Sequence, residues 1–286
     1  MNDTTKPLPT RTTRRRTEVV RAWQASGVVL ALLAIGWTTF SAFGLVAYDR
    51  FAAHHEYLEA ITIVDVDSTS GSTTIVGDGG DRVRVSSIGT RGITAPTDDQ
   101  QVEGTALHLR SRCNGITSWC SLRYTVHVPA GVAITVRTSG GATIAGVRAA
   151  VAVDAHDGHV RVQDVTGPVS VKTRNGGVQA STIHGDLSVG TTNGGITAQA
   201  VDGEHVALRT INGGVRAELT SPPRSVAAST SNGSIIVQVP RGPEAYAVRA
   251  STANGSEQTE VRTDSTSDRT IVATTRNGSI TTRYAG

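Results

Sequence analysis

Alternating apolar and polar residues fill most of the chain beyond residue 60, and short Gly-containing turns interrupt the alternation. Residues 169–174 read Val-Ser-Val-Lys-Thr-Arg, and a shorter run, Val-Gln-Ala, follows the turn at residues 175–177. Period-2 alternation with Val, Ile and Thr predicts half-buried β-strands. Asn and Gly tolerate a positive φ at little cost, so the chain can turn sharply between two such strands.

This turn recurs along the C-terminal half at a nearly constant spacing. The steps between successive turn glycines are 18, 18, 18, 19, 20, 22 and 23 residues. The glycines are Gly140, Gly158, Gly176, Gly194, Gly213, Gly233, Gly255 and Gly278. The complete Asn-Gly pairs use Asn175, Asn193, Asn212, Asn232, Asn254 and Asn277. Residues 62–75 read as an isolated first copy. A fixed period of this length is the signature of a repeat architecture.

Two all-β architectures fit the repeat. Asn-Gly between alternating strands is a strong hairpin signal, which would give an antiparallel meander. A near-constant period instead favours a β-solenoid, similar to a parallel β-helix, with one repeat of about 18–23 residues per coil. We predict the solenoid because the inward side chains are small and uniform. Stacked coils would place Asn175, Asn193, Asn212 and Asn232 in a hydrogen-bonded ladder. The later units are longer, so we expect wider coils or longer loops there.

The N-terminal segment carries a membrane signal. Residues 24–48 hold no charged side chain, and they are long enough to span a bilayer as a helix with Trp23 and Tyr48 at the interfaces. A basic segment precedes them, so the positive-inside rule places the N-terminus in the cytoplasm. We therefore predict a basic cytoplasmic tail (1–22), one transmembrane helix (23–48), a junction (49–60) and an extracytoplasmic β-repeat domain (61–286). The alternative is a cleaved signal peptide.

Charge is divided unevenly between these parts. Residues 1–48 hold 6 basic and 2 acidic side chains, whereas the rest holds 21 and 22. The high isoelectric point therefore belongs to the tail, which either sets topology or also attracts anionic lipid headgroups. The large domain is nearly neutral, so nucleic acid is not an expected partner.

The only two cysteines are Cys113 and Cys120. In an extracytoplasmic domain they are expected to form a disulfide, because one pair supplies too few ligands for a structural zinc site. The loop between them carries Trp119, and Tyr124 follows it. These two aromatic residues are a candidate contact surface; the alternative is a stapled hairpin whose Trp covers one end of the solenoid.

Catalytic and metal motifs are missing from the sequence. His156 and His159 invite a metal interpretation, but the equivalent residues one repeat later are Arg174 and Gly177, so the repeat stacks no third ligand beside them. Asp is too sparse in the turns for a calcium-binding β-roll. No nucleophile elbow, phosphate loop or dinucleotide fingerprint is present. We expect no cofactor and no enzymatic activity.

The repeated Asn-Gly-Gly-Val and Asn-Gly-Ser-Ile units resemble the bacterial DUF4097 family of toastrack-type β-repeat, adhesin-like domains. The resemblance runs from about residue 61 to the C-terminus and is strongest over residues 169–234. It implies an envelope-associated β-solenoid, often on a membrane anchor, linked in some members to envelope stress sensing. The family offers no catalytic residues to carry over. Residues 78–136 depart from the repeat, as an insertion or a capping section would.

These features together predict a non-catalytic, single-pass protein of the plasma membrane. Its β-repeat domain would act as a binding, adhesion or envelope-stress scaffold for an envelope protein or a cell-wall polymer, because solenoids present extended binding faces. Two alternatives remain: a structural spacer, and a β-helical enzyme that acts on polysaccharides.

Overall fold

The computed structural model describes residues 27, 30–38, 49–69, 71–91, 96–113 and 120–286, and the chain divides into two units, residues 1–48 and 49–286. In the first unit, residues 30–38 form a helix with exposed side chains. None of the helices in the described segments has the length and apolarity needed to cross a membrane. Most of the predicted transmembrane segment, 23–48, lies outside the described residues.

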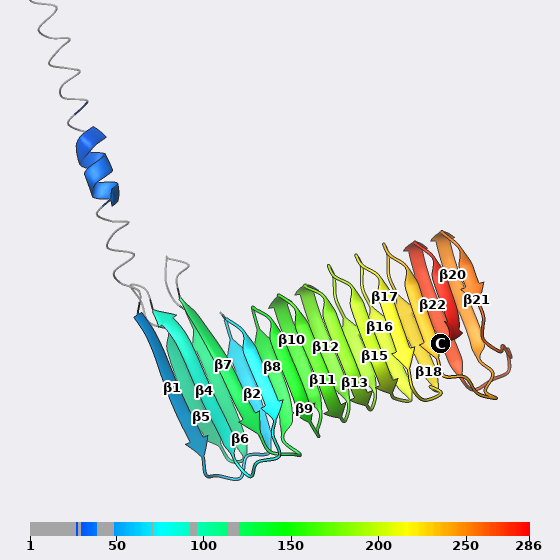
Figure 1. The fold of residues 1–286 in the computed structure, drawn as a ribbon, viewed down its shortest axis with the longest axis horizontal. Helices are drawn as coiled ribbons and strands as arrows, with labels where there is room; N and C mark the ends of the chain where they lie inside the picture. Colours follow the sequence, from blue (N-terminus) through cyan, green and yellow to red (C-terminus); the bar gives the residue numbers. More distant parts are fainter. Residues whose placement is uncertain (1–26, 28–29, 39–48, 70, 92–95, 114–119) are drawn as a thin grey trace, which may run out of the picture. The chain divides into compact units, whose positions relative to one another are not determined.

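The second unit consists of two long β-sheets (Figure 1). Sheet A has twelve strands, which are in spatial order β1 (Asp49–Tyr57), β4 (Val83–Arg91), β7 (Ser121–Val128), β3 (Thr73–Gly77), β9 (Ala142–Val147), β11 (Val160–Thr166), β13 (Val178–His184), β15 (Ile196–Asp202), β17 (Val215–Leu219), β19 (Ile235–Val239), β23 (Ile280–Tyr284) and β21 (Glu257–Thr259). Sheet B has eleven, which are β20 (Ala247–Asn254), β22 (Thr270–Asn277), β18 (Ser225–Ser229), β16 (His205–Arg209), β14 (Leu187–Gly190), β12 (Val169–Asn175), β10 (Val151–Asp157), β8 (Ala133–Thr138), β2 (Ile63–Ser68), β6 (Ala106–Arg112) and β5 (Thr97–Glu103).

Each repeat forms one flattened coil. The chain runs along a strand of sheet B, turns at Asn-Gly, runs along a strand of sheet A and turns again near a second glycine. Strands of successive coils pair in parallel and in register, so Val151 lies beside Val169 and Val160 beside Val178. The solenoid prediction is confirmed, and the hairpin meander is wrong. Asn-Gly connects two strands of different sheets because the apolar positions of successive repeats stack on one another.

Aliphatic side chains fill the space between the sheets. From sheet B, Val171, Val189 and Leu208 stack in one column with at most 2% of their surface exposed. Val178 and Ile196 of sheet A are buried equally well. The outward residues between them are polar or small, as the period-2 alternation predicts. Most of these buried side chains are Val, Ile, Leu or Ala, and the large exceptions, Tyr124 and Tyr246, lie toward the two ends of the solenoid.

The order of coils in space differs from their order in the sequence at both ends. The coil of β22 and β23 lies between the coil of β18 and β19 and that of β20 and β21. At the other end, the coil of β2 and β3 lies between those of β6–β7 and β8–β9. At the C-terminal end, the chain passes beyond the next position and then returns to fill it. At the N-terminal end, it builds the outer coil of β6 and β7 after that of β2 and β3, and then crosses back to form β8 and β9. Residues 240–246 and 260–269 make the C-terminal connections, so the longer late repeats have longer loops, as expected.

Antiparallel strands close the N-terminal end. Strand β1 pairs with β4, β4 with β7, and β5 with β6. Residues 49–60, expected as a junction, therefore include an edge strand of the β-unit. The sequence concealed it because residues 49–57 lack alternating Val, Ile and Thr. Phe51 of β1 pairs with Gly89 of β4, and a Cβ atom on Gly89 would lie 2.4 Å from the ring of Phe51. The glycine therefore makes room for the aromatic ring.

A stacked irregularity crosses sheet A. Asp164, Thr182 and Ala200 have φ values of 53°, 55° and 52°, and Gly146 occupies the preceding coil with 73°. Such values cost about 1–2 kcal/mol per residue for side chains with a Cβ. The left-handed residue shifts the alternation of inward and outward side chains by one residue. Each strand therefore continues to bury apolar side chains after the kink. Neighbouring coils share the kink and therefore remain in register.

Candidate functional site

The Asn-Gly corners align along one edge of the solenoid. Five of the six asparagines donate a hydrogen bond from Nδ2 to Oδ1 of the asparagine in the neighbouring coil, at distances of 2.8–2.9 Å. The predicted ladder is present, and it includes both late repeats. Its order is Asn175, Asn193, Asn212, Asn232, Asn277 and Asn254.

The ladder has a direction and ends on a carboxylate. Asn175 donates to Oδ1 of Asp157 at 2.8 Å, and the Nδ1 of His156 lies 2.8 Å from Oδ2. Arg174 lies 2.7 Å from Nε2 of the same ring. Because arginine only donates, His156 accepts at Nε2 and carries its proton on Nδ1. The hydrogen bond from Asn175, then that from His156, lowers the pKa of Asp157 below its usual 3.8.

A row of threonines, four of them buried and Thr252 half-buried, runs beneath the corners. Each lies two residues before its asparagine and donates a hydrogen bond to the corner glycine carbonyl of the neighbouring coil, at 2.8–3.0 Å. The donors are Thr191, Thr210, Thr230, Thr252 and Thr275. This row was not predicted, although Thr-x-Asn-Gly recurs in register along the sequence and is a signal for it.

The corner glycines are required by close packing between coils. A Cβ on Gly213 would lie 2.2 Å from the carbonyl oxygen of Gly194, and one on Gly176 would lie 1.8 Å from that of Gly158. Gly213 also has a φ of 152°. The next residue in the turn, Gly214, has more room, since its Cβ would lie 3.3 Å from the nearest atom. The first turn glycine is therefore fixed by two independent constraints.

The outer face of sheet B carries a row of charged residues. Register places in successive coils Asp67, Arg137, Asp154, Lys172, Gly190 and Arg209. Arg137 forms an ion pair of 3.1 Å with Asp65 in the adjacent row. Lys172 and Arg209 have no acidic partner within 4.0 Å among the residues that the structure describes. Two cations therefore remain available two coils apart, about 9.6 Å at the usual strand spacing.

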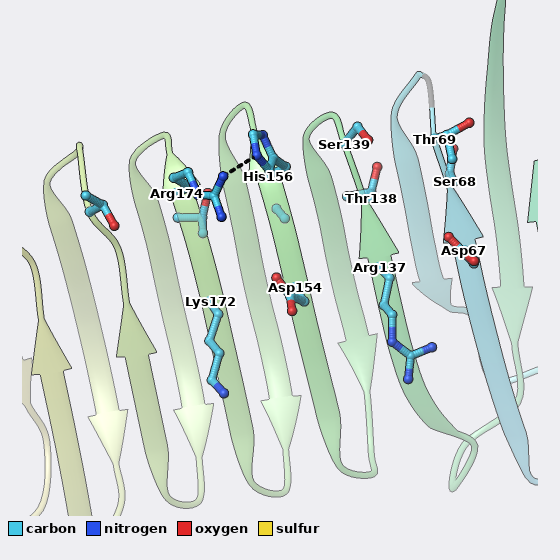
Figure 2. Close-up of a pocket in the computed structure, with 13 residues that line it drawn as sticks. Asp67, Ser68, Thr69, Arg137, Thr138, Ser139, Asp154, His156, Lys172 and Arg174 are labelled. Carbon is cyan, nitrogen blue, oxygen red and sulfur yellow. Dashed lines mark hydrogen bonds between the residues drawn. The ribbon is translucent and has the colours of Figure 1, made fainter. Parts of the chain in front are cut away.

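Two shallow hollows lie on this face. The first has a volume of about 390 Å³ and is lined by polar residues near the corner edge, including Asp154, His156, Lys172 and Arg174 (Figure 2). The second, of about 510 Å³, lies over the opposite ends of the same strands. Its floor is a row of small outward side chains, which are Thr135, Ala152, Ser170, Ser188, Ala207 and Ala227. The face thus combines a flat strip with an adjoining charged row.

Comparison with known proteins identifies the family. The model of the family described as Toastrack DUF4097 matches residues 65–283. The chain belongs to this family. A search of curated proteins finds no match.

Two solved structures are similar to this Toastrack chain. One is titled a "putative adhesin" from Bacteroides fragilis NCTC 9343; it is 15% identical, with 82% of this chain and 97% of that chain covered and a TM-score of 0.49. Another is titled a "putative cell adhesion protein" from Clostridium sporogenes ATCC 15579; it is 9% identical, with 82% and 100% covered and a TM-score of 0.29.

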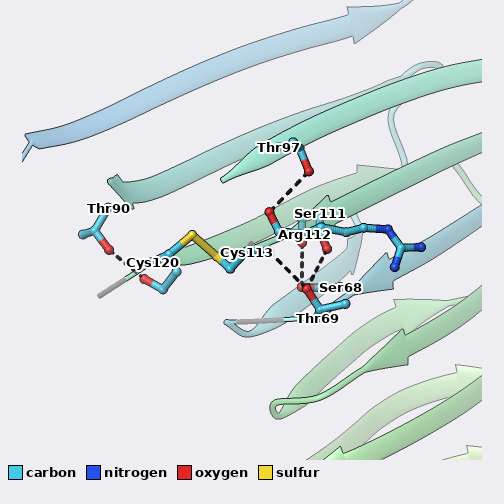
Figure 3. Close-up of a disulfide and its surroundings, with 9 residues drawn as sticks. Ser68, Thr69, Thr90, Thr97, Ser111, Arg112, Cys113 and Cys120 are labelled. Carbon is cyan, nitrogen blue, oxygen red and sulfur yellow. Dashed lines mark hydrogen bonds between the residues drawn. A yellow bond between two sulfur atoms is a disulfide. The ribbon is translucent and has the colours of Figure 1, made fainter. Parts of the chain in front are cut away.

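The predicted disulfide is present in the Toastrack domain (Figure 3). Cys113 follows β6 of sheet B and Cys120 precedes β7 of sheet A, with their Cα atoms 5.8 Å apart. The bond therefore closes one corner of a coil, at the position where later coils have Asn-Gly. Thr69 of the neighbouring coil lies beside it, with its Oγ1 3.4 Å from the amide nitrogen of Cys113.

The proposed aromatic contact surface is not supported at Tyr124, and Trp119 lies outside the described residues. Tyr124 is fully buried, and its hydroxyl donates to Oδ1 of Asp98 at 2.7 Å. Ser87 donates to the other carboxylate oxygen at 2.7 Å. Burial, followed by the bond to Asp98, raises the pKa of Tyr124. The residue joins the two sheets at the N-terminal end, which its position next to the Cys loop did not reveal.

Two histidines of the Toastrack domain, His156 and His54, already have hydrogen-bond partners. Both ring nitrogens of His156 are hydrogen-bonded, and no group of three metal-binding side chains occurs among the described residues. His54 Nδ1 lies 2.6 Å from Ser86 Oγ on exposed strands, but none of the described carboxylates contacts this histidine. The pair therefore lacks the orienting acid of a hydrolytic triad.

Proposed function

We propose that this Toastrack protein is a non-catalytic binding scaffold of the bacterial envelope. Residues 24–48 would anchor it in the plasma membrane, and residues 1–22 would remain in the cytoplasm. The β-unit would extend outside the cell and bind through the outer face of sheet B. Its partner would be an extended envelope polymer that carries negative charge.

The anchor rests on the N-terminal sequence. Residues 24–48 are uncharged and follow a segment with six basic side chains. Within the described helix, Leu30, Leu33 and Trp37 expose 66%, 65% and 74% of their surface. Large apolar side chains that remain exposed within the described part of the chain favour an apolar environment around the helix.

The arrangement of sheet B carries the binding proposal. The row of small side chains is nearly flat, so an extended chain can approach the backbone closely along several coils. Lys172 and Arg209 lie in the adjacent row and have no ion pair within the described segments. A ligand that follows the strip would pass both cations, and coils stacked in register would hold them at a fixed separation.

A non-catalytic role agrees with how the polar groups are used. In the polar hollow, His156 is fixed by Arg174 and Asp157, and neither ring nitrogen is available as a base. A polysaccharide-cleaving enzyme would need a pair of acids facing across a sugar-binding cleft. Here Asp67 and Asp154 are separated by Arg137 on the outer face of the sheet. This arrangement suits attachment of a polymer better than its cleavage.

Charge reversal on one face tests the proposal. The full chain in detergent would be sedimented with cell-wall material whose anionic polymers are retained or stripped. Lys172→Glu with Arg209→Glu should weaken binding about tenfold or more at low salt, and high salt should weaken wild-type binding. Arg161→Glu with Arg216→Glu is the matched control, because it makes the same charge change on sheet A.

Three results would contradict the proposal. One is an equal loss from both charge-reversed pairs, which would indicate a general charge effect. Another is undiminished binding to wall material without its anionic polymers. The third is the absence of wild-type binding to either material.

A further inference from the structure

The six Asn-Gly pairs of the ladder share a chemical liability. Glycine has no Cβ to hinder its own backbone nitrogen, which can approach the side-chain amide of the preceding asparagine. Attack of this nitrogen on Cγ converts asparagine into a cyclic imide. The reaction requires a side chain that can rotate and a glycine N–H that is not held elsewhere.

The ladder restrains five of the six pairs. In each of these the glycine N–H donates to the asparagine carbonyl of the neighbouring coil, as Gly233 does to Asn277 at 2.9 Å. The other four donors are Gly176, Gly194, Gly213 and Gly278. In the same five pairs, the asparagine side chain donates through Nδ2 and accepts through Oδ1. Reaction would break all three interactions.

The pair at the open end of the solenoid differs. Asn254 belongs to β20, the edge strand of sheet B, so no described coil lies beyond it. Its Nδ2 donates to Asn277 at 2.8 Å, but neither its Oδ1 nor the N–H of Gly255 has a partner among the described residues. Gly255 is exposed, whereas the corner glycines of the five restrained pairs are half-buried.

We propose that Asn254 is a self-modification site at which the folded protein deamidates selectively. The backbone nitrogen of Gly255 loses its proton and forms a bond to Cγ of Asn254. The Cγ–Nδ2 bond breaks, and ammonia leaves with that proton. Water then opens the five-membered imide at either carbonyl and gives aspartate or isoaspartate. The net change is the exchange of ammonia for one water, with no oxidation or reduction.

The product weakens the end coil. A carboxylate at position 254 no longer donates to Asn277, so two acceptors face each other. Isoaspartate also adds a main-chain carbon between β20 and β21, which displaces Glu257 from its pairing with Ile280. Deamidation should therefore release the last coil and leave the remaining coils intact.

Three of the Asn-Gly pairs are followed by serine, so their rates can be compared within one protein. Asn232, Asn254 and Asn277 are each followed by Gly-Ser. The full chain would be held at mildly alkaline pH in detergent, digested at intervals and examined by mass spectrometry. Asn254 should deamidate faster than Asn232 and Asn277 by a factor of about ten or more, because two additional hydrogen bonds must break at those two sites. Hydrogen exchange should then accelerate in residues 247–259.

Unfolding in urea is the decisive control. It should bring the three rates together, because only the folded ladder distinguishes the sites. A native rate at Asn254 no higher than that at Asn232 would overturn the proposal. A difference that persists in urea would place the cause in local sequence and would overturn it as well.

Discussion

Replacing Gly213 by alanine should destabilise the solenoid far more than the same change at Gly214. The two residues are adjacent in one turn and differ in their distance from the preceding coil. A Cβ at Gly213 would lie 2.2 Å from the carbonyl oxygen and 2.5 Å from the carbonyl carbon of Gly194. Both atoms belong to the backbone, so no side-chain rotation can relieve the overlap.

The cost follows from the interactions that a displaced corner would lose. Gly213 donates to the carbonyl of Asn232 at 2.9 Å and accepts from Thr230 at 2.9 Å. The side-chain bond from Asn212 to Asn193, at 2.9 Å, depends on the same position of the coil. Three hydrogen bonds at about 1 kcal/mol each give about 3 kcal/mol, before any backbone strain is added. A loss of this size is large for one methyl group.

Equilibrium unfolding in urea, followed by far-UV circular dichroism, measures the difference. Gly213→Ala should lower the unfolding midpoint strongly. Gly214→Ala should change the free energy of unfolding by less than about 1 kcal/mol, because its Cβ meets only one atom at 3.3 Å and the φ is not left-handed. Equal losses from the two variants, or a Gly213→Ala protein as stable as the wild type, would refute the reasoning.

Three further changes test other parts of the structure. Thr230→Val removes a buried donor to a corner carbonyl and should lower the free energy of unfolding in urea by about 1–2 kcal/mol. Thr282→Val should cost nothing, because that buried hydroxyl has no hydrogen-bond partner among the described residues; equal costs would contradict the assignment. Because the folded pKa of Asp157 is lowered, its bond to Asn175 is fully present above pH 3.8 and is lost as the pH falls through that lower pKa. The side-chain amide NMR signals of Asn175 should shift only below pH 3.8, and a midpoint above that value would refute this. Thr182→Gly relieves a left-handed backbone and should raise the free energy of unfolding in urea slightly, by up to about 1 kcal/mol; a clear loss of stability would show that the kink is not strained.

The repeat itself was predictable because stacking requires the same residue at the same position in every coil. Asn175, Asn193 and Asn212 recur in register with the apolar positions, and this was sufficient to predict coils and a side-chain ladder. The disulfide between Cys113 and Cys120 followed from the expected location of the domain. The coils and the ladder depend on local sequence that repeats, and the disulfide depends on a single cysteine pair.

The ends could not be predicted in the same way. Asn254 precedes Asn277 in the sequence, yet the ladder passes from Asn232 to Asn277 and ends at Asn254. All three have nearly identical local sequences, so nothing local determines which coil lies outermost. Non-local packing also explains Tyr124, because its hydrogen-bond partner, Asp98, comes from the other sheet. The kink at Thr182 carries no glycine or proline to signal it.

The candidate binding face illustrates the same limit. The sequence predicts that polar side chains point outward, but only the register shows that Lys172 and Arg209 share a row. Only the ion-pair geometry shows that Arg137 in the same row already has an acidic partner. The face is therefore a product of stacking and could not be read from any single repeat.

Photo-crosslinking in intact cells tests the central claim, that sheet B is the binding face, most directly. A photoreactive residue would replace Ala207 on the outer face of sheet B or, as the matched control, Gln199 on the outer face of sheet A; both positions are exposed. The proposed function predicts adducts to envelope polymer from position 207 and few or none from position 199. Adducts from position 199 alone, or equal adducts from both faces, would contradict it.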